Sequence, residues 1–128
     1  MKRIILDTNF LIIPGELNVD IFTEIQRIAN FPYRIYTFDR VINELNKLAR
    51  EGSGKLKQAA KLGLQLIAAK QVEVIKSKNN LNADELILQS TNPETDIVAT
   101  QDRELKRKLK ERGVHLLVLR KKKYLNLI

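Results

Sequence analysis

The hydrophobic positions of this chain follow two alternating patterns, one typical of strands and one typical of helices. Short apolar runs or apolar–polar alternation predict five strands, over residues 3–7, 34–38, 72–75, 97–100 and 116–119. Between them, apolar residues at helical spacing predict helices over residues 19–29, 40–49, 55–70, 82–88 and 103–112. Strands that alternate with helices imply the α/β class, with a mostly parallel five-stranded sheet, right-handed crossovers and helices on both faces.

Local sequence signals indicate where several of these elements begin or end. The Pro-Gly pair at residues 14–15 predicts a turn that ends the apolar stretch after the first strand. Asp39 and Asp102 each have the position of a helix N-cap. Asn82 and Glu85 have the spacing of a capping box, which predicts a helix start at this point.

The overall composition excludes several classes of protein. The 128 residues are 44% hydrophobic and 30% charged, as expected of a single globular domain over residues 1–128. There is no cysteine and one histidine, His115, which excludes disulfides and thiolate chemistry and argues against zinc sites and a serine–histidine triad. The lack of cysteine fits a cytoplasmic protein, and we expect His115 to be structural. Asp7 interrupts the first apolar run too early for a secretory signal, and no stretch has membrane-spanning length.

The excess of basic charge is concentrated in one C-terminal segment. The net charge is +8, and residues 103–123 contain ten Lys or Arg and two Glu, whereas the remainder carries thirteen charges of each sign. This segment is either a solvated helix face with a tail or a surface that binds nucleic-acid phosphates. Only 5% of the residues are aromatic, which argues against base stacking as the main binding mode. The candidate nucleic-acid-binding residues are Arg103, Lys106, Arg107, Lys110, Arg120, Lys121, Lys122 and Lys123.

Four acidic residues are expected at one edge of the predicted sheet. Asp7 directly follows the apolar run Ile4–Leu6, and Asp102 follows the fourth predicted strand. Glu44 and Asp84 border the apolar faces of helices that come after earlier strands. Because the carboxyl ends of parallel strands meet at the same edge of a sheet, we expect these four side chains to lie close together. The acids that precede or begin strands should lie at the opposite edge and are excluded as metal ligands: Asp96, Glu94 and Glu73.

Each of these acids also has a purely structural interpretation. Asp102 could serve only as an N-cap, and Glu44 could be a solvated flank residue. Asp84 and Glu85 could complement a helix dipole. Asp7 is the hardest to explain in this way, because a carboxylate that closes an apolar strand is costly when it is buried without a partner.

Several carboxylates in one cleft favour a hard divalent cation. Such carboxylates raise each other's pKa values by repulsion, and a bound cation relieves that repulsion. Mg²⁺ takes oxygen ligands and keeps several waters, and Mn²⁺ suits the same ligands. One or two ions of this kind could polarise a phosphoryl oxygen and lower the pKa of a water that attacks it.

The four acids lie in short motifs that resemble those of the PIN-domain (PilT N-terminus) nucleases, over nearly the full chain. The opening Asp-Thr-Asn or Asp-Thr-Ser motif of that family corresponds to Asp7-Thr8-Asn9, and its helix acid corresponds to Glu44. Its Ala-Asp pair corresponds to residues 83–84, and its late Thr-x-Asp motif to residues 100–102. The stretch 97–109 looks most like the branch linked to small-subunit rRNA processing.

This resemblance implies a PIN-like three-layer α/β/α sandwich that frequently forms dimers. It also implies a Mg²⁺- or Mn²⁺-dependent endoribonuclease that hydrolyses the phosphodiester bonds of RNA and leaves a 5′-phosphate. The catalytic metal ligands implied by the resemblance are Asp7, Glu44, Asp84 and Asp102. The groups implied to orient these carboxylates or a bound water are Thr8, Asn9 and Thr100.

Three other functions remain open from the sequence. A toxin ribonuclease of the VapC type would use the same acids and would be restrained by an antitoxin. A non-catalytic RNA-binding module would keep the fold and bind RNA or a ribosome-assembly partner. A response-regulator-like domain would need a late lysine beyond a strand, for which Lys121 is a poor match because it lies in a run of basic residues.

Overall fold

The computed structural model describes all 128 residues, and its centre is a six-stranded sheet. The strands are β1 (Lys2–Leu6), β2 (Tyr33–Phe38), β3 (Glu73–Ile75), β4 (Asp96–Ala99), β5 (His115–Arg120) and β6 (Tyr124–Leu127). Their order across the sheet is β3-β2-β1-β4-β5-β6, so that β1 lies between β2 and β4. β1 to β5 are parallel, and β6 pairs antiparallel with β5.

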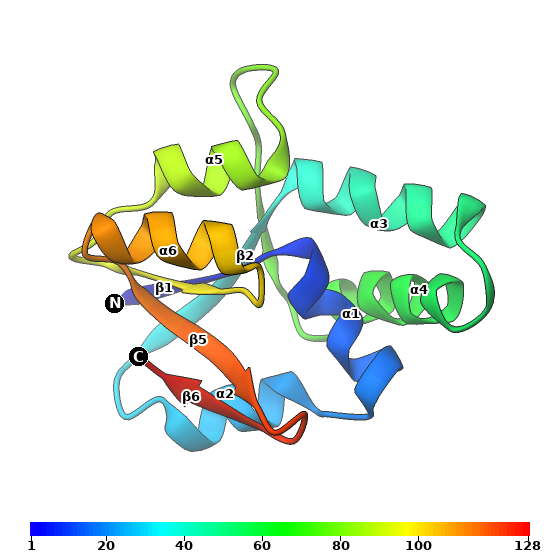
Figure 1. Ribbon diagram of the computed structural model, residues 1–128, viewed down its shortest axis with the longest axis horizontal. Coiled ribbons are helices and arrows are strands. Elements are labelled where there is room, and N and C mark those ends of the chain that lie inside the picture. The colour runs from blue at the N-terminus through cyan, green and yellow to red at the C-terminus, as the bar shows by residue number, and fades with distance from the viewer.

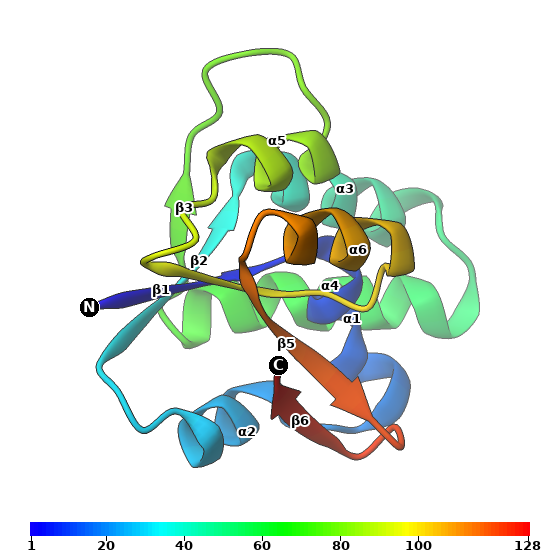
Figure 2. The same ribbon diagram turned by 60° about the vertical axis from the view of Figure 1, so that its left-hand side comes forward.

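Helices cover both faces of the sheet. They are α1 (Thr8–Leu17), α2 (Ile21–Ile28), α3 (Asp39–Glu51), α4 (Gly54–Ala69), α5 (Ala83–Ser90) and α6 (Arg103–Glu111). α1, α3 and α4 pack together on one face, α5 and α6 pack together on the other, and α2 packs against β6 (Figure 1, Figure 2). The predicted α/β class, mostly parallel sheet and two helical layers are therefore confirmed. None of the helices is both long and apolar enough to cross a membrane.

The first turns of α1, α3, α5 and α6 converge at one edge of the sheet (Figure 1). α1, α3 and α6 begin within a few residues of the ends of β1, β2 and β4. Because these three strands are parallel, their carboxyl ends lie at the same edge. α5 reaches the same place after the loop 76–82 that follows β3. This edge therefore collects residues from four separate parts of the chain.

The strands β1 and β4 form the centre of the hydrophobic core. The residues Ile4–Leu6 and Ile97–Ala99 are each at most 3% exposed. Burial on both faces explains why these strands appear in the sequence as continuous apolar runs rather than as alternating ones. The core holds 32 buried hydrophobic residues in one cluster. Asp7 and Thr100, which directly follow these two strands, are held by this packing.

The expectation of five strands is wrong, because residues 124–127 add β6 at the edge of the sheet. β6 pairs with β5 so that Asn126 lies opposite Val118. Only Leu125 of β6 is fully buried, at 1% exposure. The short apolar end of the chain carries little strand pattern of its own, and its pairing depends on the turn that follows β5.

The predicted turn at residues 14–15 is also wrong, because α1 continues through Pro14 to Leu17. The helix persists beyond the proline, since the carbonyl of Pro14 accepts a hydrogen bond from the N–H of Asn18 at 3.1 Å. Gly15 lies where α4 crosses α1, and a Cβ at this position would come within 2.5 Å of the Cα of Ala59. Gly15 therefore permits close packing of two helices rather than a turn.

All three predicted helix starts are confirmed to within one residue, but only two of the three predicted capping roles are confirmed. Asp102 is the N-cap of α6, and Asn82 and Glu85 form the capping box of α5. Asp39 lies inside the first turn of α3, and its side chain caps nothing. Its carboxylate accepts hydrogen bonds from the backbone N–H and the hydroxyl of Ser77, each at 3.1 Å. Asp39 thus ties the start of α3 to the loop after β3.

Candidate active site

Asp7 lies at the carboxyl end of β1 and is only 3% exposed. Its Oδ1 accepts a hydrogen bond from the N–H of Phe10 at 2.8 Å, so the side chain caps α1. Its Oδ2 accepts a hydrogen bond from the hydroxyl of Thr100. Burial raises the pKa of Asp7 to about 7 despite these two donors, and the nearby Asp84 and Asp102 carboxylates contribute to the rise. The protein therefore compensates the negative charge of Asp7 incompletely.

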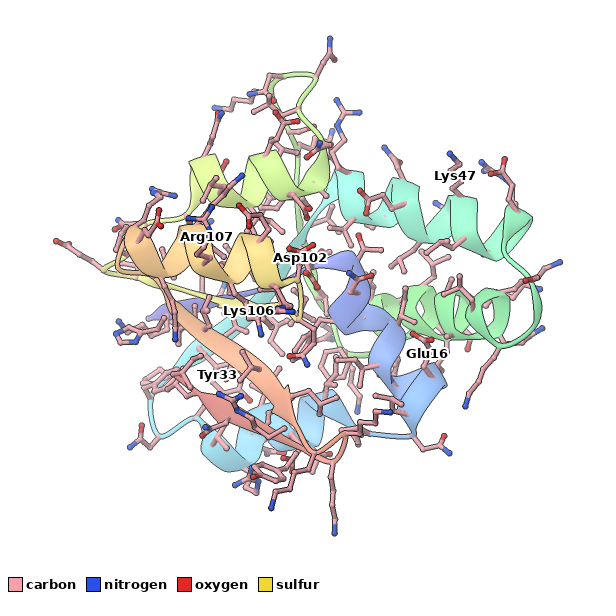
Figure 3. The ribbon with its side chains drawn as sticks, viewed as in Figure 1. Glu16, Tyr33, Lys47, Asp102, Lys106 and Arg107 are labelled. Atoms are coloured by element: carbon pink, nitrogen blue, oxygen red, sulfur yellow. The ribbon has the colours of Figure 1, made fainter.

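Thr100 connects Asp7 to Asp102. It is fully buried and directly follows β4. Its hydroxyl oxygen accepts a hydrogen bond from the backbone N–H of Asp102 at 3.1 Å while the hydroxyl donates to Asp7. Oδ1 of Asp102 accepts a hydrogen bond from the N–H of Leu105 at 2.8 Å. Figure 3 shows Asp102 at the start of α6, where that helix faces the start of α1.

Glu44 reaches the same edge of the sheet from α3. Its side chain is exposed, and Oε2 accepts a hydrogen bond from the hydroxyl of Thr8, the residue after Asp7. A cavity of about 380 Å³ lies here, and three of the four predicted acids share it. The cavity is lined by Asp7, Thr8, Asn9, Glu44, Lys47, Leu48 and Asp84.

Asp84 lies in the first turn of α5 and borders a second cavity of about 150 Å³ as well as the first. Asp102 and Glu104 line this second cavity. Burial raises the pKa of Asp84, the nearby Asp102 carboxylate raises it further, and Lys108 lowers it. The four predicted acids therefore surround two adjoining cavities that have Asp84 in common.

Comparison with known proteins assigns this arrangement to a family. Residues 4–122 match the family model described as a PIN like domain. The chain belongs to the PIN-like domain family. It is 35% identical over 125 residues to Ribonuclease VapC4 of Methanocaldococcus jannaschii, an alignment that covers 97% of this chain and 95% of that protein.

Solved structures of similar fold agree with the family assignment. The PIN domain endonuclease Utp24 matches this PIN-like domain with a TM-score of 0.78 and 21% identity, over 98% of this chain and 90% of that one. A domain of a functionally unknown protein from Methanocaldococcus jannaschii matches with a TM-score of 0.64 and 17% identity, over 94% and 92%. At these identities the matches support the fold. The PIN-domain resemblance is confirmed, and the response-regulator-like alternative is wrong.

The donor atoms around the two cavities of this PIN-like domain fit a hard divalent cation. Asp7, Asp84 and Asp102 supply oxygen donors, and they lie close enough for their charges to raise the pKa values of Asp7 and Asp84. No three acidic or histidine side chains lie close enough to enclose an ion by themselves. Mg²⁺ usually keeps several waters and takes only one or two carboxylates, so this spacing fits an ion with a water-rich shell. Direct contact of all four acids with the ion stays a prediction.

The three acids that were excluded as metal ligands lie at the amino-terminal ends of their strands, at the edge of the sheet opposite the two acidic cavities, as expected. Asp96 begins β4 and is 1% exposed, and its carboxylate accepts two hydrogen bonds from Arg3, at 2.9 and 2.8 Å. Glu73 begins β3 and pairs with Arg34 at 3.2 Å. Glu94 precedes β4 and is exposed. None of these three acids lines either acidic cavity.

The three predicted orienting groups differ in what they contact. Thr8 and Thr100 each donate a hydrogen bond to one of the predicted acids. Asn9 is exposed and lines the larger acidic cavity. His115 lies outside the site, exposed at the start of β5, with Nδ1 3.3 Å from the carbonyl oxygen of Ile128.

Two lysines that were not predicted as site residues line the acidic cavities. Lys47 lines the larger cavity, and Lys108 lines the smaller one. Lys47 follows Glu44 by three residues and therefore lies on the same side of α3, a spacing that could have indicated it.

A larger cavity of about 590 Å³ lies away from this site, between α2 and β2. Glu73 is the one acidic residue among those that line it.

The eight predicted nucleic-acid-binding residues fall into two groups, of which only the first begins beside the acidic cavities. One group lies on α6, which begins directly after Asp102. The other group lies at the carboxyl end of β5 and in the turn to β6, and β5 is parallel to β4. The α6 group is Arg103, Lys106, Arg107 and Lys110, and the turn group is Arg120, Lys121, Lys122 and Lys123.

Proposed function

We propose that this chain is a divalent-metal-dependent endoribonuclease whose active site is formed by the two adjoining acidic cavities. The observation that carries the proposal is Asp7, a carboxylate that is only 3% exposed, forms no ion pair and lines one cavity with Glu44 and Asp84. An ionised carboxylate in this setting is unfavourable without a nearby cation. Membership of the PIN-like domain family and the full-length similarity to Ribonuclease VapC4 support nuclease activity and an RNA substrate.

In this proposal, four acids hold one or two Mg²⁺ or Mn²⁺ ions, directly or through water: Asp7, Glu44, Asp84 and Asp102. When bound, such an ion supplies positive charge to the phosphoryl oxygens and lowers the pKa of the attacking water. The protein's own contribution is to orient the acids. Thr100 holds Asp7, and Thr8 holds Glu44.

We favour a VapC-type toxin over an rRNA-processing enzyme. The similarity to a VapC ribonuclease reaches 35% identity over nearly the whole chain. The match to the Utp24 PIN domain is 21% identical and supports the fold alone. A toxin of this type implies a protein antitoxin as partner. The presence of all four acids argues against a non-catalytic RNA-binding or assembly module.

Cleavage of labelled single-stranded RNA in Mg²⁺ or Mn²⁺ tests the nuclease assignment. Asp7→Asn should abolish cleavage, because it removes the charge of the buried carboxylate. Asp96→Asn is the matched control, since it makes the same change at the opposite edge and should leave the activity of folded protein intact. Equal cleavage by wild type and Asp7→Asn would reject the proposal. Mg²⁺ binding without any cleavage would favour the non-catalytic module.

Expression in a host cell tests the toxin role separately. Wild type should arrest growth and Asp7→Asn should not, because arrest requires RNA cleavage. Co-purification of a small protein that restores growth would identify the antitoxin. If wild type cleaves RNA in vitro but leaves growth unaffected, the toxin role is wrong and the nuclease assignment stands.

A further inference from the structure

The basic side chains of α6 differ in whether acids neutralise them. Arg107 pairs with Glu104 and also with Glu111, at 2.7 Å from the latter. Lys108 lies 4.0 Å from Glu104. The other three cations of α6 form no ion pair: Arg103, Lys106 and Lys110.

The unpaired cations of α6 share one side of the helix. Their spacing of three and then four residues places Arg103, Lys106 and Lys110 in one row. Figure 3 shows Lys106 on the side of α6 nearer β5 and Arg107 on the side nearer α5. The row begins at Arg103, the residue after Asp102, and therefore starts beside the acidic cavities.

The turn between β5 and β6 holds lysines in an unfavourable backbone conformation. Lys121 and Lys122 have φ angles of 54° and 52°, in the left-handed region. The N–H of Lys123 donates to the carbonyl of Arg120 at 3.0 Å and closes the turn. Turns with two successive positive φ angles are normally built from glycine or asparagine. Backbone strain that a simple replacement could relieve is often retained at functional sites.

The lysines of this turn are also unpaired. Lys122 and Lys123 border a hollow of about 270 Å³ together with Asp20 and Glu24, but no ion pair forms between them. Asp20 accepts hydrogen bonds from its own helix start at Thr23, and Glu24 pairs with Arg27. The two acids therefore have other partners, and the ammonium groups remain available.

The α6 row and the lysine turn are tied to each other through Gln101. Its side chain accepts a hydrogen bond from the N–H of Leu119 at 2.7 Å and donates to the carbonyl of Leu119 at 3.2 Å. Leu119 precedes Arg120 at the end of β5, and Gln101 precedes Asp102. These bonds hold the start of α6 against the base of the turn.

We propose that these residues form one basic surface that binds the phosphate backbone of an RNA strand beside the acidic cavities. The basic surface consists of Arg103, Lys106, Lys110, Lys121, Lys122 and Lys123. This inference rests on the proposed nuclease function, and it specifies which of the basic residues contact the substrate. Arg107 is not part of the surface, because its guanidinium group forms ion pairs with Glu104 and Glu111.

The charge of the surface favours a nucleic acid over an acidic protein. It carries cations with no partner, and it adjoins a site proposed for phosphodiester hydrolysis. A phosphate backbone supplies regularly spaced anions along such a strip, and these contacts position a strand without reading its sequence. Binding should therefore be strongly salt-dependent and nearly independent of base sequence.

Binding of a labelled single-stranded oligouridine, measured without divalent cations over a salt series, tests the surface apart from cleavage. K106Q/K110Q should weaken binding on the order of tenfold at about 0.1 M salt and lower the slope of log Kd against log salt by about 1.4. K55Q/K61Q is the matched control, because it removes the same charge from two exposed lysines of α4, on the other face of the sheet. Equal loss in both double variants would overturn the proposal.

A double substitution in the turn between β5 and β6 distinguishes RNA binding by its lysines from a purely structural role. K121N/K122G should raise the Tm by a few degrees, because asparagine and glycine accept positive φ at lower cost. It should weaken oligouridine binding at the same time. A higher Tm with unchanged RNA affinity would show that the lysines are strained without function and would overturn their inclusion.

The outcomes separate this inference from the proposed nuclease function. If wild type cleaves RNA but K106Q/K110Q binds and cleaves as wild type does, the surface is wrong and the nuclease stands. If wild type binds oligouridine through these residues but never cleaves it, the proposed nuclease function is wrong and the proposal of an RNA-binding surface stands. If wild type binds polyglutamate and not oligouridine, the occupant is an acidic protein and the RNA proposal is overturned.

Discussion

The hydroxyl of Thr100 donates a hydrogen bond to Oδ2 of Asp7 across two neighbouring parallel strands. The register of β1 and β4 pairs Leu6 with Ala99, so the residues that follow each strand are side by side. The same hydroxyl accepts the N–H of Asp102 at 3.1 Å. One buried side chain thus sets the positions of two of the proposed metal-binding acids.

Thr100→Val should lower both stability and activity. The change keeps the shape of the side chain but leaves Oδ2 of Asp7 and the N–H of Asp102 without a partner, at a cost of about 1–3 kcal/mol. It should also raise the pKa of Asp7 further, because a donor to the carboxylate is lost. Urea denaturation and RNA cleavage measure the two effects. Thr100→Ser keeps the hydroxyl and should restore most of the activity; a Val variant as active as the Ser variant would contradict this role.

Asp7→Asn should stabilise the metal-free protein above neutral pH. The folded-state pKa of Asp7 is about 7, against a usual value of 3.8, because of burial. Between these two values the folded protein keeps a proton that the unfolded chain has released, so this group lowers stability as pH rises from about 4 to 7. The penalty persists above this range and should amount to a few kcal/mol.

Unfolding of both proteins in a chelator, at about pH 5 and about pH 8, measures this effect. The gain in stability from Asp7→Asn should be larger at the higher pH. Asp96→Asn serves as a control with the same chemical change at a paired carboxylate. A gain that is the same at both pH values would show that Asp7 titrates normally in the folded protein.

Mg²⁺ or Mn²⁺ should raise the Tm of wild type, because the acidic cavities exist only in the folded state. A concentration of one hundred times the Kd should stabilise by about 2.7 kcal/mol. The effect should shrink below about pH 7, since protons compete with the metal for Asp7. Calorimetry in matched ionic strength separates it from simple screening of the net charge. A Tm that does not respond to either ion would argue against a metal site.

Asp96→Asn should destabilise the protein by about 3 kcal/mol without affecting the folded enzyme's activity. Asp96 is buried, and it accepts hydrogen bonds from Arg3 and from the N–H of Asn92 at 2.8 Å. Removing its charge leaves Arg3 without an anionic partner. Denaturation and specific activity per folded molecule measure the two quantities. A loss of specific activity similar to that of Asp7→Asn would contradict the assignment of opposite edges.

The sequence alone determined the features that depend on local spacing. The run Ile4–Leu6 followed by Asp7 identified a buried strand with an acid at its end, and the capping box of Asn82 and Glu85 identified a helix start. Strand direction then assigned acids to one edge or the other, which correctly separated Asp7 from Asp96. These features were accessible because residue periodicity encodes which face of an element is buried and where the element ends.

Only the tertiary structure decided the features that depend on contacts between distant segments. The close approach of α4 made Gly15 a helix contact instead of a turn, and pairing with β5 made residues 124–127 a strand. Ion pairing removed Arg107 from the free cations of its helix, and packing spread the four acids over two cavities. The physical reason is that close packing and charge pairing depend on positions in space, and separation along the chain does not specify them.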